Sequence, residues 1–331
     1  MTTRRTSGSV DGGRVTLKEN PLLAYAKEQP ALILDAGLAT ALEDKGHRLD
    51  DDLWSARLLA DDPGAISRAH TEFLIAGADC ITTASYQASP AGFNKAGLTD
   101  ADGERLLRRS ADLALEARDT FWNGAGQRRQ RIRPLVAASI GPYGAYLADG
   151  SEYTGDYRVS DEELREFHQR RWDILNDTRV DLFACETIPS RQEAQILLKL
   201  LAGTGDRWAW LSFSCQDDAH LCDGSRISDV ASECHSIPQV AAIGVNCCRP
   251  EFVSGLIHHV RQVCDKPIIV YPNSGETYCP TSKDWRPDAV PFDLDSAAVD
   301  WLASGAIGIG GCCRVHSADI AGLRDRIVPD S

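Results

Sequence analysis

Two groups of cysteines carry the most distinctive chemistry in this sequence. The first ends the run GVNCC at residues 244–248, and the second ends the run GGCC at residues 310–313. Each follows a short apolar stretch of the kind that forms a buried strand. If both strands are parallel and share one sheet, their carboxyl ends lie on the same side, and three or four sulfur atoms can meet at one point. A soft metal, above all zinc, would suit that point.

The spacing of these cysteines favours a catalytic over a structural zinc site. Structural sites use C-x-x-C pairs, whereas Cys312 and Cys313 are adjacent and the two groups are far apart in the chain. Neighbouring residues of a straight strand point to opposite faces, so the chain must turn for both to reach one ion. Gly310 and Gly311 permit such a turn. Three thiolates leave one tetrahedral position open. The plainer alternative is that these are small cysteines of the core.

Three protein thiolates also determine what the zinc can do. They give the site a net charge of −1, which makes it a poor activator of water but a good holder of a fourth thiolate. A substrate thiol bound there loses its proton near neutral pH and stays nucleophilic. This chemistry suits the transfer of an alkyl group from a positively charged donor to a thiol.

The elements that must position these cysteines follow from the hydrophobic pattern. Eight short apolar runs alternate with segments of helical period, and the expected strands cover residues 31–34, 80–83, 135–140, 182–185, 208–213, 240–243, 267–271 and 306–309. Ser160 with Glu163 and Ser190 with Glu193 are expected capping boxes at the starts of two helices. The alternation predicts an α/β fold, a single-domain (β/α)8 TIM-type barrel over residues 21–331. An open doubly wound sheet is the second candidate, although no G-x-G-x-x-G motif follows the first strand.

Composition indicates the compartment of this protein and the classes of partner that it disfavours. Residues 1–20 are polar, rich in Gly and Ser near their start, and expected to be disordered. The eleven cysteines and the lack of a leader-like apolar segment predict a reducing cytoplasm. A net charge of −13 argues against binding to nucleic acid or an anionic membrane. No apolar run approaches the roughly 20 residues that cross a bilayer.

Polar residues at the expected strand ends are candidates for substrate binding. In a barrel, these ends share the rim where active sites are built. Asp35 and Glu186 could hold the ammonium group of an amino-acid thiol, and backbone N–H groups around Gly37 could take its carboxylate. Asn273 follows the strand expected at 267–271. Plainer roles stay open, because Asp35 can merely shape a turn and Glu186 can pair with an arginine at the rim.

A segment after the third expected strand interleaves aromatic and acidic residues. Its members are Tyr143, Tyr146, Asp149, Glu152, Tyr153, Asp156 and Tyr157. Aromatic faces and carboxylates favour a sulfonium or quaternary ammonium group. Ordinary loop packing explains the same composition equally well.

Taken together, these motifs resemble the homocysteine S-methyltransferases, a family that includes S-methylmethionine-dependent enzymes and is related to betaine–homocysteine methyltransferase. The resemblance runs from Leu32 to the C-terminal helix. It rests on the segments LDAGLAT at 34–40, TASYQAS at 83–89, SIGPYGA at 139–145, ADGSEY at 148–153, CETIP at 185–189, GVNC at 244–247 and GGCCR at 310–314.

The resemblance implies a (β/α)8 barrel whose zinc is held by Cys247, Cys312 and Cys313. It further implies that Asp35 and Glu186 contact the amino group of homocysteine, and that the loop containing Tyr143 faces the methyl donor.

Two positions depart from the family pattern. Ala36 stands where the family usually has glycine, which could alter the turn that binds the substrate carboxylate. Cys248 is an extra thiol beside a ligand, and it is either a spectator or a fourth ligand that blunts activity.

The predicted reaction is the zinc-dependent transfer of a methyl group from a sulfonium donor to L-homocysteine, which forms methionine. S-methylmethionine is the favoured donor, S-adenosylmethionine is a weaker one, and betaine is less favoured. The alternatives are a non-catalytic barrel that senses zinc or thiols, a cysteine-rich barrel without metal, and transfer to another thiol. The expected partners are these small molecules, and the expected state is a monomer or homodimer.

Overall fold

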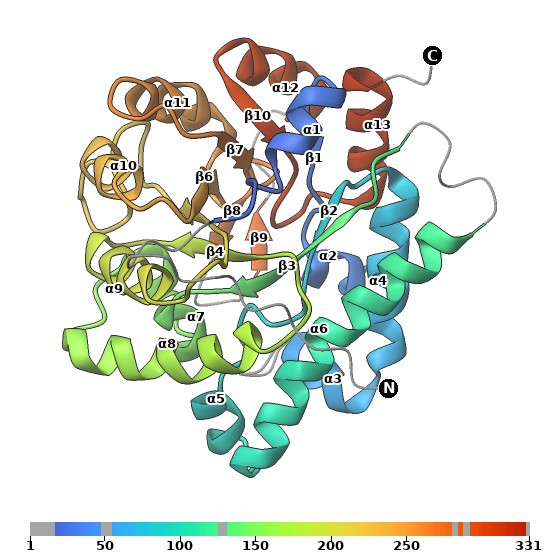
Figure 1. Ribbon diagram of the computed structural model, residues 1–331, viewed down its shortest axis with the longest axis vertical. Coiled ribbons are helices and arrows are strands. Elements are labelled where there is room, and N and C mark those ends of the chain that lie inside the picture. The colour runs from blue at the N-terminus through green and yellow to red at the C-terminus, as the bar shows by residue number, and fades with distance from the viewer. Residues whose placement is uncertain (1–16, 48–54, 125–130, 280–283, 287–291, 329–331) are drawn as a thin grey trace.

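The computed structural model describes residues 17–47, 55–124, 131–279, 284–286 and 292–328. Within these ranges eight parallel strands form one sheet at the centre of the molecule, and helices surround it (Figure 1). The strands are β1 (Leu32–Ile33), β2 (Cys80–Thr82), β3 (Leu135–Ile140), β4 (Leu182–Ile188), β5 (Ala209–Phe213), β6 (Val240–Asn246), β7 (Ile268–Tyr271) and β10 (Ala306–Ile309).

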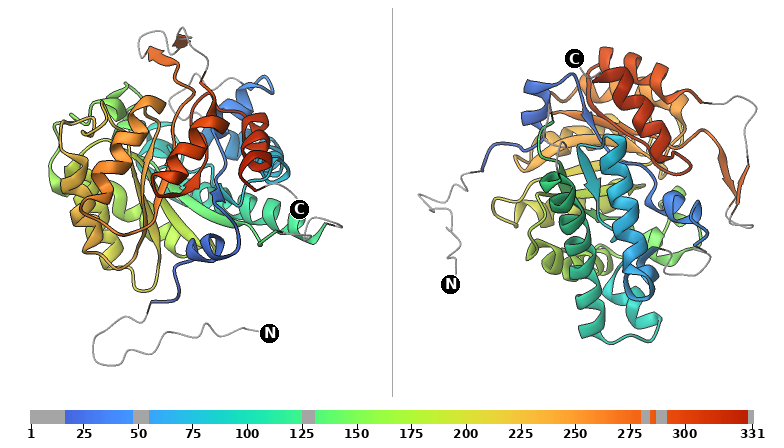
Figure 2. Two further views of the ribbon diagram at one scale, coloured as in Figure 1. Left: turned by 90° about the horizontal axis from the view of Figure 1, so that it is seen from above. Right: turned by 90° about the vertical axis from the view of Figure 1, so that its right-hand side faces the viewer.

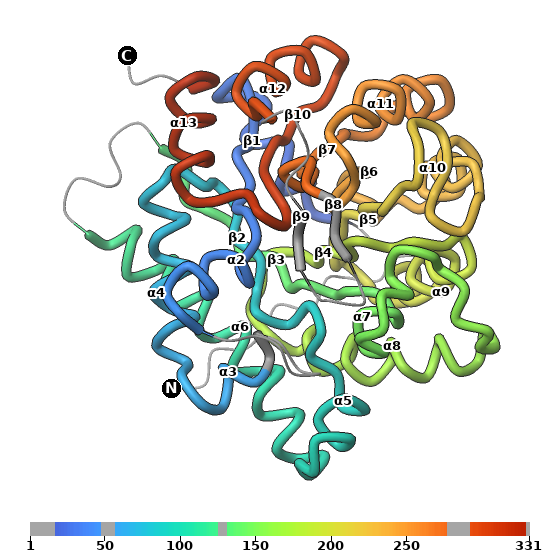
Figure 3. Tube along the Cα trace, turned by 180° about the vertical axis from the view of Figure 1, so that it is seen from behind, coloured from blue at the N-terminus to red at the C-terminus, as the bar shows by residue number. Residues whose placement is uncertain are grey.

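The sheet closes on itself. Its order is β1-β10-β7-β6-β5-β4-β3-β2, so the strands follow one another around the sheet in the order of the chain. β1 lies beside β10 (Figure 3). On its other side it meets β2 through the parallel bridge between Leu34 and Cys80 and a 3.0 Å hydrogen bond from the Asp35 N–H to the Cys80 carbonyl. This closure confirms the predicted single-domain (β/α)8 barrel and excludes the open doubly wound sheet.

Helices cover the outer face of the barrel, and the long helices α4 and α6 run side by side on one flank (Figure 2). The helices are α1 (Leu23–Glu28), α2 (Leu38–Glu43), α3 (Ser55–Asp61), α4 (Pro63–Ala76), α5 (Pro90–Lys95), α6 (Asp100–Asn123), α7 (Tyr143–Leu147), α8 (Asp161–Asn176), α9 (Arg191–Ala202), α10 (Ile227–His235), α11 (Val253–Arg261), α12 (Leu294–Ala303) and α13 (Ser317–Ile327). Two 3₁₀ turns, η1 (Ser151–Tyr153) and η2 (Pro250–Phe252), and a two-stranded antiparallel pair, β8 (Thr277–Cys279) and β9 (Asp284–Arg286), complete the described elements. The pair lies after β7, outside the eight strands expected from the apolar runs.

One of the two predicted capping boxes forms. Ser160 accepts a hydrogen bond from the Glu163 N–H at the start of α8, and the Glu163 carboxylate accepts one from the Ser160 N–H. Ser190 likewise accepts from the Glu193 N–H at the start of α9. The Glu193 carboxylate, however, turns to a buried site between α7, α8 and α9, so the second box is wrong in its side-chain half.

Apolar side chains fill the inside of the barrel up to the level of the site. Trp210 of β5 crosses the interior and donates a 3.0 Å hydrogen bond to the Tyr271 hydroxyl, so the indole N–H is satisfied although it is buried. Leu22 and Tyr25 join this inner cluster from the side where the strands begin. The Tyr25 hydroxyl donates to the Arg133 carbonyl at 2.6 Å. The amino-terminal end of the barrel is therefore sealed, which leaves the opposite end for a binding site.

The chain before α1 is attached to the barrel floor. Asn20 is buried and donates a 2.8 Å hydrogen bond to the Ala241 carbonyl of β6. The segment expected to be disordered, residues 1–20, thus ends in residues that pack on the barrel, and its residues 1–16 lie outside the described chain. Among the described helices, none has the length and apolar character needed to span a membrane.

Candidate active site

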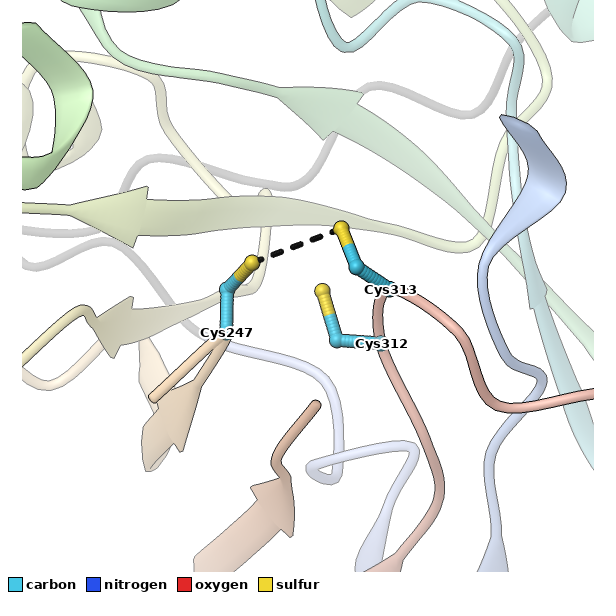
Figure 4. Close-up of side chains that lie close together, drawn as sticks. All are labelled: Cys247, Cys312 and Cys313. Carbon is cyan, nitrogen blue, oxygen red and sulfur yellow. Dashed lines mark hydrogen bonds between the residues drawn. The ribbon is translucent and has the colours of Figure 1, made fainter. Parts of the chain in front are cut away.

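Three cysteines converge at the carboxyl-end rim of the barrel. Cys247 follows β6, while Cys312 and Cys313 follow β10, and β7 lies between these two strands. All three sulfur atoms lie within 4.8 Å of one another, and the Sγ atoms of Cys247 and Cys313 are 3.6 Å apart. Figure 4 shows the three side chains turned toward a common point. The residues chosen from the sequence as metal ligands are therefore brought together.

Local backbone geometry aims these sulfurs. Cys247 has a left-handed backbone (φ +50°), which lets the residue directly after β6 turn its side chain into the rim. The prediction that Gly310 and Gly311 supply backbone freedom needs correction, because neither has a positive φ. They are needed for space: a Cβ on Gly310 would lie 2.6 Å from the Leu34 Cβ, and one on Gly311 would lie 2.2 Å from Val315 Cγ1.

Asn246 and Tyr153 contact sulfur atoms of the cysteine cluster. The Asn246 amide donates to Thr187 Oγ1 at 2.8 Å and approaches Cys312 Sγ at 3.9 Å, while its oxygen accepts from the Thr187 N–H at 2.8 Å. The Tyr153 hydroxyl lies 3.8 Å from Cys247 Sγ. Sequence reasoning assigned no role to Asn246, although its position beside Cys247 was a signal that could have suggested one.

The donor set fits a soft, tetrahedral cation. Hydrogen bonds from Cys312 and Cys313 hold the pKa of the Cys247 thiol well below its usual value. The same contacts with Cys247 and burial raise the pKa of Cys312 and of Cys313. The protein alone thus favours one thiolate in the cluster, and ionisation of all three needs a cation. With Zn–S bonds of about 2.3 Å, ligands of a tetrahedral zinc lie about 3.8 Å apart, close to the observed sulfur spacing.

A pocket of about 110 Å³ opens directly over the cysteines. A water molecule needs only about 10 to 15 Å³ by this kind of measure, so the pocket has room for a small organic molecule. Among the described residues, its lining combines the three cysteines with carboxyl, hydroxyl and aromatic groups and contains no lysine, arginine or histidine; the polar and aromatic members include Asp35, Thr82, Tyr86, Glu152, Tyr153, Glu186, Asn246 and Tyr271.

Two of these carboxyl groups are the predicted substrate contacts. Asp35 is 6% exposed and accepts a 2.7 Å hydrogen bond from the Thr82 N–H. Burial, with a contribution from Glu186, raises its pKa to about 8. Glu186 is 8% exposed, accepts a hydrogen bond from the Ser139 hydroxyl, and has its pKa raised to about 7 by burial. Neither forms an ion pair within the described chain, so the arginine partner considered for Glu186 is not found there.

The position of Glu186 differs slightly from the prediction. β4 continues to Ile188, so Glu186 lies within the strand and not just after it. Its side chain points inward because strand residues alternate between the two faces. The pocket is therefore reached by a residue on a rigid strand, which fixes the carboxylate more firmly than a loop would.

The family model described as homocysteine S-methyltransferase matches residues 32–327 of this chain. The chain belongs to the homocysteine S-methyltransferase family. Its relatives include the homocysteine S-methyltransferase YbgG of Bacillus subtilis, 45% identical over 91% of this chain and 96% of the relative. A homocysteine S-methyltransferase of Escherichia coli is 43% identical over 93% of this chain and 99% of the relative.

The fold comparison agrees with this family. The crystal structure of the homocysteine methyltransferase MmuM from Escherichia coli in its metallated form superposes with a TM-score of 0.83. It is 42% identical, and the match covers 93% of this chain and all of that one. The chain is thus an enzyme of the homocysteine S-methyltransferase family over nearly its whole length.

Other residues singled out in this homocysteine S-methyltransferase lie away from the pocket wall. Tyr143 lies at the start of α7, where its ring packs against Tyr146, Tyr157 and Phe167. Asn273 is buried, and its side chain accepts a 3.0 Å hydrogen bond from the Gly275 N–H, which shapes the chain after β7. Neither is among the pocket-lining residues, so a direct substrate contact for them stays a prediction.

The two departures from the family pattern, Cys248 and Ala36, leave the cysteine cluster intact. Cys248 is buried in the hydrophobic layer behind the barrel wall and is not part of the cysteine cluster. Ala36 does not adopt a positive φ, so its side chain causes no backbone strain. The position that does require glycine is the next one.

Gly37 is needed because the chain after β10 passes against it. Its N–H donates a 3.1 Å hydrogen bond to the Cys312 carbonyl, and a Cβ there would lie 2.8 Å from that oxygen. We expect Gly37→Ala to displace Cys312 and to lower kcat/KM by about 100-fold, the loss that a displacement of about 1 Å can cause. Gly203→Ala is the matched control, because its Cβ would meet nothing closer than 3.5 Å. Equal activity of the two variants would contradict this role.

A second group of side chains that could bind a metal ion, His235, Cys264 and Asp265, lies outside the pocket. His235 Nδ1 is 3.5 Å from Cys264 Sγ and 3.3 Å from a carboxylate oxygen of Asp265. These residues precede β6 and β7, so they lie at the end of the barrel opposite the pocket. His235 and Asp265 are exposed, and the group has no part in the site described above.

Proposed function

We propose that this protein transfers a methyl group from a sulfonium donor to L-homocysteine bound through its thiolate to zinc, and so forms methionine. The observation that carries the proposal is the cluster of Cys247, Cys312 and Cys313 at a pocket with two buried carboxyl groups that have no cationic partner in the part of the chain that the structure describes. A zinc ion held by these cysteines supplies a fourth position where a thiol loses its proton near neutral pH and remains nucleophilic.

The carboxyl groups orient the amino-acid part of homocysteine. Asp35 follows β1 and Glu186 lies in β4, so the two carboxyl groups enter the same pocket from strands that β2 and β3 separate, and an ammonium group between them would satisfy both. The Gly37 N–H, considered for the substrate carboxylate, is instead bonded to Cys312. Leu38 and Ala39 in the first turn of α2 line the pocket, and their N–H groups, which by helix geometry have no intrahelical acceptor, are the proposed contacts of the substrate carboxylate.

The charge of the pocket favours a cationic donor. Its described lining carries carboxyl groups and the rings of Tyr86, Tyr153 and Tyr271, and no basic side chain. Such surroundings stabilise a sulfonium through its positive charge. The modest volume favours the compact S-methylmethionine over S-adenosylmethionine, which carries a nucleoside. The cytoplasmic location and the monomeric or homodimeric state stay predictions.

The decisive test is methionine formation by the reduced, zinc-loaded protein. S-methylmethionine, S-adenosylmethionine and betaine are offered separately with homocysteine. Turnover with a sulfonium and little with betaine is the expected result. Bound zinc and homocysteine binding without turnover for any donor would instead support a sensing role. Turnover only with betaine would correct the donor.

The raised pKa values predict how homocysteine binding depends on pH. The ammonium group needs ionised carboxylates, and those of Asp35 and Glu186 form as the pH rises through about 8 and about 7. The KM for homocysteine should therefore fall between about pH 6 and pH 9. Asp35→Asn should remove the part of this fall nearest pH 8. An unchanged profile in that variant would show that thiol ionisation alone causes the dependence.

Asp35 and Glu186 should make the substrate-free protein less stable as the pH rises. Their folded pKa values lie above the unfolded value of about 4, so protonated carboxyls favour the folded state. This contribution is present below pH 4 and is lost as the pH rises through 7 to 8. Thermal unfolding without substrate should show the loss, and Asp35→Asn should reduce it.

A further inference from the structure

Glu152 is a buried carboxyl group in the pocket wall that the binding of homocysteine does not use. It is only 4% exposed, and it lines the pocket beside Tyr153. Its Oε2 atom has no hydrogen-bond partner within the described chain. A buried carboxylate oxygen without a partner is costly, and such atoms in native proteins usually await a ligand or water.

The backbone around Glu152 is held so firmly that the side chain cannot easily leave the pocket. A Cβ on Gly144 of α7 would lie 2.4 Å from the Glu152 nitrogen, so the two segments are in direct contact. Ser214, after β5, donates a 3.3 Å hydrogen bond to the Glu152 carbonyl. The next residue, Tyr153, places its hydroxyl 3.8 Å from Cys247 Sγ. Glu152 thus lies on the side of the pocket next to the Cys247 sulfur.

We propose that Glu152 forms the subsite for the sulfonium centre of the methyl donor, as its counter-ion. The inference rests on the proposed function and adds the residue that selects the donor by charge. Asp35 and Glu186 already serve the ammonium of the acceptor, which leaves Glu152 as the further buried carboxylate of the pocket. The neighbouring rings of Tyr86 and Tyr153 complete the surroundings of the cation.

The reaction itself predicts which kinetic constant Glu152 controls. A lone pair of the homocysteine sulfur forms the new S–C bond while the bond from the methyl carbon to the sulfonium sulfur breaks, and its electron pair stays on the leaving thioether. The positive charge of the donor therefore disappears during the step. Part of this charge is still present in the transition state, so a fixed carboxylate stabilises the bound donor and the transition state to a similar extent, and it strengthens donor binding without raising kcat. It also has little attraction for the neutral thioether product.

The test compares Glu152→Gln with the wild-type holoenzyme. We expect the KM for S-methylmethionine to rise by about 30-fold or more, the loss that follows when one partner of a buried charge pair is removed. The kcat, the KM for homocysteine and the zinc content should stay within about twofold of wild type. Asp156→Asn is the matched control, because it removes the same charge from an exposed position of the same segment.

Two inhibitors identify the group that Glu152 contacts. Trimethylsulfonium carries the sulfonium without an amino group, so its inhibition constant should rise in Glu152→Gln by a similar factor. Methionine has the shape of the donor without the sulfonium charge, and its inhibition constant should not change. A weaker effect on trimethylsulfonium than on S-methylmethionine would place Glu152 at the donor ammonium and overturn the proposal.

The two levels of the hypothesis fail in different ways. If wild-type protein forms no methionine from any donor, the proposed function fails and Glu152 has no donor to bind. If wild type is active and Glu152→Gln keeps the wild-type KM for S-methylmethionine, the Glu152 subsite alone is wrong. A fall in kcat with unchanged KM would also overturn it, because that result would assign Glu152 to the chemical step.

Discussion

Replacing Cys312 with alanine is expected to abolish methyl transfer and zinc binding together. The substitution removes one of three sulfurs that lie within 4.8 Å of one another, and it leaves Cys247 and Cys313 as a two-ligand site. Homocysteine then loses both its activation as a thiolate and its position at the floor of the pocket. Because these effects combine, kcat/KM should fall by roughly a thousandfold or more. Zinc content by elemental analysis and methionine formation are measured on the same preparation.

Cys248→Ala is the control that isolates the cluster from ordinary thiol loss. Cys248 is adjacent to Cys247 but is buried in the hydrophobic layer, outside the cluster. We expect this variant to keep its zinc and most of its activity, with a modest loss of stability from the smaller side chain. Full activity of Cys312→Ala, or equal loss of zinc in both variants, would remove the basis for the proposed metal site.

The second large effect is expected at Glu193, whose carboxylate joins three elements. It accepts hydrogen bonds from the Tyr143 N–H at 2.6 Å, the Tyr157 hydroxyl at 3.0 Å and His168 Nε2 at 2.8 Å. Arg171 can only donate, so its 2.8 Å contact makes His168 Nδ1 the acceptor and places the proton on Nε2. Burial lowers the pKa of His168 to about 4, which keeps the ring neutral. The buried guanidinium of Arg171 thus reaches the carboxylate through the ring.

Glu193→Ala should lower the free energy of unfolding by about 3 to 5 kcal/mol, because it leaves a buried cation and several donors without their partner. The segment from Tyr143 to Tyr157, which contains Glu152, should loosen, and the KM for the donor should rise. Denaturant unfolding and donor kinetics measure the two effects. Glu163→Ala, which removes an exposed capping carboxylate of α8, should stay within about 1 kcal/mol of wild type. Equal stability of these two variants would contradict the role of the network.

The strands and the convergence of Cys247, Cys312 and Cys313 could be predicted from the sequence because their signals are local. A parallel strand buried on both faces gives a continuous apolar run, such as residues 135–140, that no helical period disturbs. The cysteine pairs follow such runs directly, and closure of the barrel brings the strand ends together.

Helix α6, by contrast, was not placed, although Thr99 accepts a hydrogen bond from the Asp102 N–H as its cap. Its buried face repeats at helical spacing, as at Leu107, Ala111, Ala114 and Phe121, so the sequence did carry the signal of this helix.

The roles of Glu193 and Glu152 could not be predicted, because they depend on partners that are distant in sequence. Glu193 satisfies the local capping pattern with Ser190, but its side chain finds three stronger partners on α7, α8 and the loop between them. Glu152 looked like one acid among several in a loop. It is buried because Gly144 and Ser214 hold its backbone against the barrel, a consequence of tertiary packing alone.

The origin of the three sulfurs has a consequence for how the protein is made. Cys247 follows β6, but the other two cysteines follow β10, the strand that completes the barrel between β1 and β7. During synthesis from the amino end, a nascent chain cannot assemble all three ligands until β10 has emerged and docked. Metal binding at these three cysteines therefore has to follow the completion of the barrel, and incomplete chains gain no stability from it.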